Sequence, residues 1–142
     1  MGVLRYSWGM TYLSQLPKEM QELVVRLPFR VGLYISESDK TGGSDSAEAE
    51  RKALENIVTF YVEDTVKGEF AHEVMNETLR LKSVWGAWGG DIGLVDEECL
   101  KMSRELVGVL DLREVLAFKQ NLLEIAFVVA QAYREFDDSA DM

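Results

Sequence analysis

Apolar residues recur at intervals of three and four along most of this chain, and that spacing constrains its fold more than any other feature. Residues at these intervals share one face of an α-helix, whereas a half-buried strand alternates apolar and polar residues, and no such alternation is sustained here. The spacing predicts five helical segments, at about 17–36, 46–67, 69–85, 95–109 and from 112 onward.

The size of the chain sets how these helices are organised. A chain of 142 residues with 47% hydrophobic content can build one core, and no linker interrupts it. We therefore predict an all-α, single-domain helical bundle of five to seven helices over residues 1–142, with short frayed segments at both ends.

Prolines and glycines mark the expected helix boundaries. Pro17 suits the first position of a helix, and Pro28 removes an internal hydrogen bond, so we expect a kink or a break there. Four glycines within residues 86–93 predict a loop. Trp85 and Trp88 flank these glycines, and we expect their indoles to close one end of the core, although an exposed aromatic platform is the alternative.

Two acidic pairs have the spacing of a helix capping box: Asp45 with Glu48, and Asp111 with Glu114. The helical period also predicts which side chains of the last two helices point into the core. These residues are Leu100, Leu106, Val107, Leu110, Val115, Leu116, Leu122, Leu123, Ala126, Phe127, Ala130 and Tyr133.

The charge of the chain excludes several kinds of partner. Its formal net charge of -10 repels polyanions, so we expect neither nucleic-acid binding nor attachment to anionic membranes. The most apolar stretch, 122–132, contains Glu124 and Gln131 and is far shorter than the roughly 20 residues that span a bilayer. We therefore expect no transmembrane segment, and a protein partner or a homodimer remains open.

Cys99 is the only cysteine, so the chain can form neither an intrachain disulfide nor a CxxC redox pair. Glu97 and Glu98 should raise the pKa of its thiol and oppose thiolate chemistry. The N-terminal residues also lack the uninterrupted apolar run of a signal peptide. These features predict a cytoplasmic protein.

His72 is the only histidine, and with Glu69 it forms an ExxH pattern. Carboxylate-bridged di-iron bundles need two such patterns, and zinc sites of the HExxH type and Ser-His-Asp triads also need histidines that this chain lacks. We therefore predict that His72 is a surface or half-buried residue, and that Glu69, Glu73 and Glu77 form a solvated helix face.

An acidic loop at residues 39–50 is the candidate metal site. With Asp39 as position one, Asp45 stands at seven and Glu50 at twelve, with Glu48 nearby, which resembles the oxygen-ligand spacing of a calcium loop. The metal candidates are therefore Asp39, Asp45, Glu48 and Glu50.

The match to a calcium loop is incomplete. Ser44 stands at position six, where the turn of such a loop needs glycine. In the alternative interpretation, Gly42 and Gly43 make the turn, Asp45 caps the next helix, and the glutamates favour its positive end.

Three segments together resemble the TerB-like family of tellurite-resistance proteins: LPFRVGLYISESD at 27–39, AEAERKALENIV at 47–58, and LLEIAFVVAQAYREFDD at 122–138. The resemblance implies a helical bundle with an internal pseudo-repeat, acidic patches that bind a divalent metal, and a role in stress or tellurite resistance without known catalysis. The positions that match the family's acidic loop are Asp39, Asp45, Glu48 and Glu50. Lys40 and Thr41 follow Asp39 where that family usually has glycine.

These features predict a non-enzymatic helical module that binds calcium or magnesium through the acidic loop. Two alternatives stay open: an enzyme built on carboxylates alone, and a structural or protein-interaction helical dimer. The sequence identifies no catalytic residue.

Calcium should raise the melting temperature of the chain if the loop binds it, because a ligand specific to the folded state stabilises that state. Asp39→Asn should erase this shift and leave the melting temperature in chelator nearly unchanged, since Asp39 precedes the predicted helix cap. Thermal melts of both proteins with millimolar calcium and with chelator measure the effect. Coincident wild-type curves would contradict the metal site.

Overall fold

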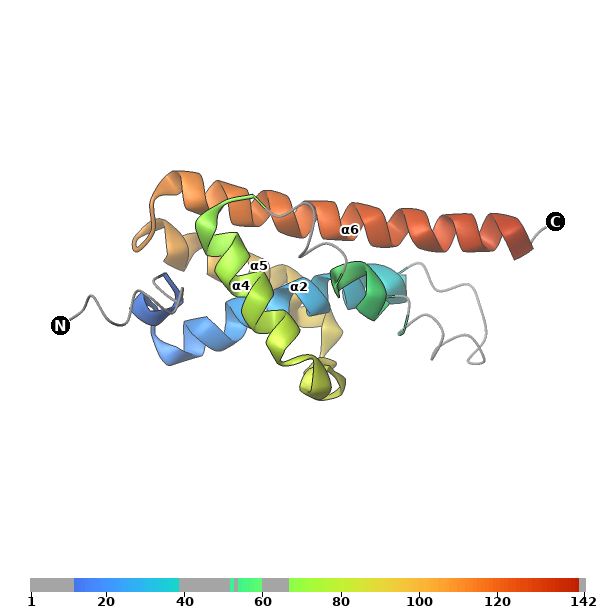
Figure 1. Cartoon of the computed structure of the whole chain (residues 1–142), viewed down its shortest axis with the longest axis horizontal. Helices are drawn as coiled ribbons and strands as arrows, with labels where there is room; N and C mark the ends of the chain where they lie inside the picture. Colours follow the sequence, from blue (N-terminus) through green and yellow to red (C-terminus); the bar gives the residue numbers. More distant parts are fainter. Residues whose placement is uncertain (1–11, 39–51, 53, 60–66, 141–142) are drawn as a thin grey trace.

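The computed structural model describes residues 12–38, 52, 54–59 and 67–140, and all regular structure within these ranges is helical (Figure 1). Residues 54–59 belong to a short helical stretch. The labelled elements are η1 (Leu13–Gln15), α2 (Lys18–Ser38), α4 (Glu69–Arg80), η3 (Lys82–Trp88), η4 (Ile92–Leu94), α5 (Val95–Val107) and α6 (Leu112–Ala140). The predicted all-α helical bundle is confirmed.

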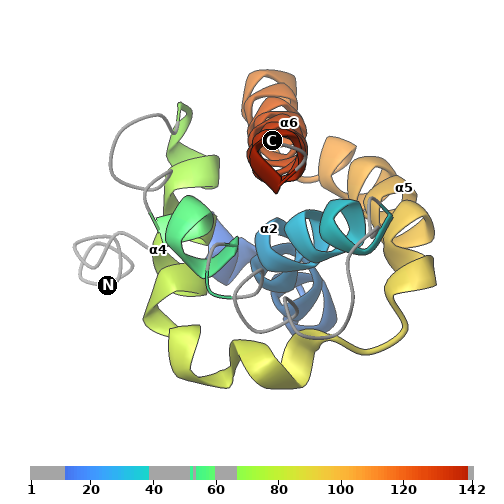
Figure 2. The same ribbon diagram turned by 90° about the vertical axis from the view of Figure 1, so that its right-hand side faces the viewer.

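Helix α2 lies in the middle of the bundle and packs against α4, α5 and α6. Figure 2 shows α4 and α5 on opposite sides of α2, with α6 above them. Helix α6 has 29 residues and runs along the length of the molecule in Figure 1. Every other long helix therefore packs against α2 or α6.

Two aromatic clusters fill the core between these helices. The ring of Phe29 on α2 lies 5.1 Å from that of Trp85, and Trp88 packs against the same phenylalanine at 6.4 Å. On the other side of the bundle, Phe70 of α4 meets Phe118 of α6 edge to face at 5.2 Å. Both tryptophans are buried, as expected, and the indole Nε1 of Trp85 donates to the carbonyl of Thr78 at 2.8 Å.

Several expected boundaries were wrong. Helix α2 continues through Pro28 without a break. The helix predicted at 69–85 begins at Glu69 but ends at Arg80. A 3-10 helix follows it at Lys82–Trp88 and includes the first residues of the predicted loop at 86–93. A second 3-10 helix at Ile92–Leu94 occupies part of the same segment, so only residues 89–91 lack helical structure there.

The N-terminus of α4 is held by a residue of α6. Glu114 Oε1 accepts a hydrogen bond from the backbone N–H of Phe70 at 3.0 Å, so this glutamate caps a neighbouring helix and does not complete a capping box with Asp111. Asp111 does cap its own helix, because its Oδ1 accepts from Arg113 N at 3.0 Å. Gly68 is required beside this contact: its φ is 91°, and a Cβ there would lie 2.7 Å from that of Ala117.

Arg30 joins α2 to the η3–η4 region and to α5. Its Nε and Nη2 bind the two carboxylate oxygens of Glu98 at 2.9 and 3.0 Å. Its Nη1 and Nη2 also donate to the carbonyls of Trp88, Gly89 and Asp91 at 2.8 to 3.0 Å. The side chain is only 7% exposed, so all of these bonds form at a largely desolvated guanidinium.

Replacement of Arg30 by methionine should lower the free energy of unfolding by about 3 kcal/mol, because Glu98 would lose its partner while staying mostly buried. Urea denaturation measures the change. Arg26→Met is the matched control: Arg26 lies on the exposed side of the same helix, 5.9 Å above the Trp88 ring, and should contribute less than about 1 kcal/mol. Equal losses in the two variants would contradict the role assigned to Arg30.

Candidate functional site

The four predicted metal ligands, Asp39, Asp45, Glu48 and Glu50, lie outside the described residues. Within the ranges that the structure describes, no group of three or more His, Cys, Asp or Glu side chains is arranged to hold a metal ion. The calcium or magnesium site of the acidic loop therefore stays a prediction.

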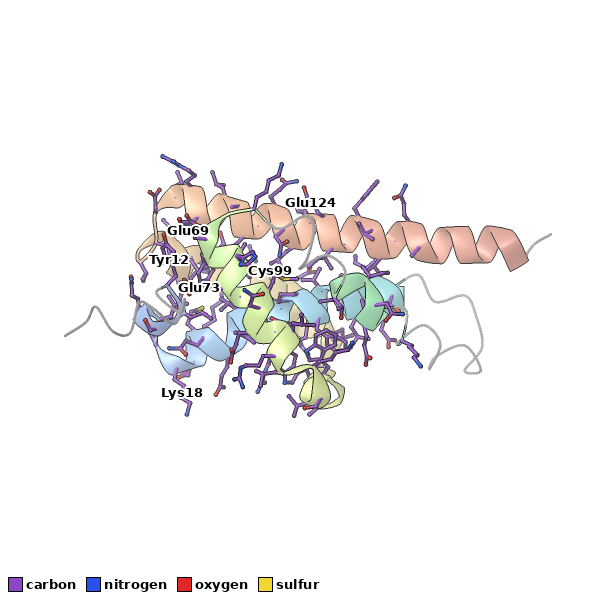
Figure 3. All side chains as sticks on the ribbon, viewed as in Figure 1. Tyr12, Lys18, Glu69, Glu73, Cys99 and Glu124 are labelled. Atoms are coloured by element: carbon purple, nitrogen blue, oxygen red, sulfur yellow. The ribbon has the colours of Figure 1, made fainter. Side chains whose placement is uncertain are left out.

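His72 is exposed on α4, and its Nδ1 lies 3.1 Å from the amide nitrogen of Asn76. Of the three glutamates expected to form a solvated face, Glu69 is exposed, whereas Glu73 and Glu77 are only partly exposed. The carboxylate of Glu73 accepts hydrogen bonds from the backbone N–H groups of Tyr12 and Leu13 at 3.0 to 3.1 Å. Glu69 accepts from the Tyr12 hydroxyl at 3.2 Å, and Figure 3 shows these residues gathered at one end of α4. These carboxylates attach the N-terminal 3-10 helix to α4.

Large exposed apolar side chains gather on α5 and α6. Leu100 is 60% exposed, Leu123 66% and Phe127 63%. The full set on the two helices is Leu100, Val107, Leu112, Leu116, Leu123 and Phe127. We had expected all of these residues except Leu112 to point into the core, and that prediction was wrong.

An open groove of about 750 Å³ runs between α5 and α6 beside these side chains. Its apolar lining is formed by Leu100, Met102, Leu116, Leu122 and Leu123. Asp96, Cys99, Ser103, Lys119 and Gln120 complete the lining. The two helices are joined by the short turn at 108–111, so the groove lies between neighbouring helices of one hairpin.

The groove exists because α6 is apolar on two faces. The face toward α2 and α4 buries Val115, Phe118, Leu122, Ile125 and Val129. A second stripe at positions 112, 116, 123 and 127 also has helical spacing, but it is turned away from the core and no described element covers it. Figure 3 shows side chains of α6 standing clear of the rest of the molecule.

The charged side chains of α6 balance between residues 112 and 132. Arg113, Glu114, Lys119 and Glu124 are the only charged residues between 112 and 132, two basic and two acidic. The net charge of -10 therefore resides elsewhere on the chain, and this face presents apolar groups in an electrically neutral setting.

The apolar stretch of α6 is longer than the predicted stretch at 122–132. By length and composition, Leu112–Ala132 is the one helical segment within the described residues that could cross a membrane, with 21 residues and a mean hydropathy of 1.3. Within the most apolar 18-residue part of this segment, 33% is buried inside the molecule against the other helices. The same helix is thus both a core helix and the carrier of the exposed stripe.

Cys99 is half-buried in the wall of this groove. Burial raises the pKa of its thiol, and the carboxylates of Asp96 and Glu98 raise it further. The predicted direction is confirmed, although burial contributes more than the neighbouring charges. The thiol therefore remains protonated near neutral pH and acts as an apolar part of the groove.

Comparisons with protein-family models, with curated proteins and with solved structures find no match to this chain. The resemblance to the TerB-like family therefore stays a prediction. The groove has to be interpreted from its own geometry.

Alkylation of Cys99 by iodoacetamide should be slower in the native chain than in urea at pH 7.5, because burial and the Asp96 and Glu98 carboxylates raise the pKa of its thiol and so lower the thiolate fraction. The native rate should rise with pH and reach its midpoint above that of the unfolded chain. Mass spectrometry follows the reaction. Equal rates and equal midpoints in the two states would contradict the assigned environment.

Proposed function

We propose that this chain is a non-enzymatic interaction module that binds an amphipathic helix in the groove between α5 and α6. The observation that carries the proposal is the coincidence of an open, apolar groove with six exposed large apolar side chains on the two helices that form it. Monomeric proteins rarely expose contiguous apolar surface of this kind, and such patches mark interaction sites.

The shape of the groove favours a helix as the occupant. Amphipathic helices bind between two helices by placing residues at positions i, i+3 or i+4, and i+7 into an apolar groove. The walls here supply matching leucines at comparable spacing, Leu116 and Leu123 on α6 with Leu100 on α5. Lys119 and Asp96 in the lining offer one charge of each sign, so a strongly charged helix gains little.

A membrane surface fits the groove less well than a helix does. The apolar stripe is interrupted at its middle by Lys119 and Gln120. The chain also carries a net charge of -10, which opposes approach to anionic lipid. A protein helix can pair with these polar positions, whereas lipid chains cannot.

The metal-dependent role implied by the TerB-like resemblance is a separate proposal. It would depend on residues 39–50, which lie outside the described residues, whereas the groove proposal rests on α5 and α6. The two proposals can therefore be tested independently, and removal of divalent cations should leave groove binding unchanged.

A fluorescent synthetic helix tests the groove directly. The probe keeps the α6 stripe residues and replaces the core-facing apolar residues by alanine and glutamine, and the control peptide carries serine in place of the stripe residues. The first peptide should bind to the chain and the second should not. Fluorescence anisotropy at low protein concentration measures both affinities.

Leu100→Lys should weaken binding of the first peptide at least about tenfold, because it places a charge in the apolar wall. Val84→Lys is the matched control, since Val84 is also exposed but lies on η3, outside the groove. Equal binding of the two peptides, or equal effects of the two substitutions, would overturn the proposal.

A further inference from the structure

We infer that the helix that occupies the groove is α6 of a second copy of this chain, packed antiparallel to the first about a two-fold axis that passes between Lys119 and Gln120. This inference rests on the proposed function, because it names the partner of the same groove. It follows from the positions, exposure and charge of the residues on the outer face of α6.

The exposed apolar residues of α6 are arranged symmetrically along the helix. Leu116 and Leu123 lie at equal distances along the sequence from the midpoint between residues 119 and 120. Leu112 and Phe127 also lie at equal distances from that midpoint. When a second α6 runs antiparallel about this point, each Leu116 faces Leu123 of the other copy, and each Leu112 faces Phe127. A two-fold interface needs this kind of self-complementary surface.

The extent of the apolar surface matches what a dimer requires. From residue 112 to 127 the stripe is roughly 22 Å long at the rise of an α-helix. All four of its apolar residues are more than half exposed, and Leu100 and Val107 of α5 widen the same surface. Six such side chains present on the order of 500 Å² of apolar area, toward the upper end for a monomer. A stable interface buries about 800 Å² per partner, so the polar side chains around the patch must supply the rest of the contact.

The charges around the stripe permit two copies to meet despite the net charge of the chain. Residues 112–132 of α6 carry no net charge, and charges elsewhere are screened beyond about 8 Å at physiological ionic strength. Lys119 lies beside the axis, and Gln120 Nε2 donates to Glu124 Oε2 at 3.0 Å. The polar middle of the stripe therefore places Lys119 and Gln120 at the axis, and the apolar residues lie on either side of it.

A charge-pair experiment tests both the dimer and its register. Leu116→Lys and Leu123→Glu should each weaken dimerisation at least about 100-fold, because each places a charge against an apolar partner. The double variant L116K/L123E places lysine opposite glutamate twice across the two-fold axis. It should dimerise at least about tenfold more tightly than either single variant. Sedimentation equilibrium measures the dissociation constants, and circular dichroism confirms that each variant stays folded.

The same double variant excludes other arrangements. In a parallel pair, residue 116 faces 116 and residue 123 faces 123, so the double variant would bring like charges together twice and dimerise more weakly than either single variant. That result would overturn the antiparallel register. Val84 lies outside the surface, so Val84→Lys should leave the dissociation constant of the dimer at its wild-type value.

A chemical cross-link provides an independent measurement. In a Cys99→Ala background, Gln120→Cys should be joined to its counterpart by a short bis-maleimide within minutes, since position 120 lies beside the proposed axis. Asn76→Cys is exposed on α4 and should give little cross-linked dimer at the same concentration. Equal yields from the two positions would contradict the proposed interface.

Three results separate this inference from the proposed function. A chain that binds the synthetic helix but stays monomeric at every concentration overturns the dimer and leaves the interaction module standing. A chain that neither binds the synthetic helix nor dimerises overturns both proposals. A monomer that floats with phosphatidylcholine vesicles, and loses this property with Leu123→Glu, overturns the dimer in favour of a lipid surface.

Discussion

The buried guanidinium of Arg30 is the interaction on which the positions of the other elements depend. Four of its hydrogen bonds come from Nη1 and Nη2, to the Glu98 carboxylate and to three backbone carbonyls of the 88–91 segment, and Nε supplies a fifth. A segment with so many glycines has little intrinsic preference for one conformation, and the arginine supplies that preference by binding its carbonyls. Glu98 is followed directly by Cys99 and Leu100 in the groove wall, so the same contact that binds the 88–91 segment also joins this wall of the groove to α2.

The groove follows from a mismatch between the apolar surface of α6 and the space that the core provides. One face of this helix is enough to cover α2 and α4, and its large residues there are buried. The remaining stripe is as apolar as the buried one but has no described element over it. A helix that is apolar on all sides is normally enclosed, so an exposed second stripe leaves hydrophobic free energy that is realised only on association. The proposed interaction function rests on this exposed face of α6.

The spacing of apolar residues predicted the fold class and most of the helix faces that point into the core. It did so because, in a helix with one apolar side, that side is the buried one. It failed at Leu100, Leu116, Leu123 and Phe127, since spacing identifies apolar residues but does not say which of two apolar faces meets the core. The breadth of the apolar pattern in α6, wider than one face needs, was the available signal. The Arg30 and Glu114 contacts join residues 44 to 68 positions apart and have no local signature. The acidic loop at 39–50 was the sharpest feature of the sequence, and it lies outside the described residues.

The distribution of charge explains how one face can associate while the rest of the chain does not. A protein with a net charge of -10 repels its own copies at long range, and this repulsion keeps most surfaces apart. A neutral face avoids that repulsion only when it meets another neutral face, and residues 112–132 of α6 carry no net charge. The acidic composition and the apolar groove are therefore compatible: the charge disfavours association through other faces, and the neutral stripe determines the orientation in which two copies can meet.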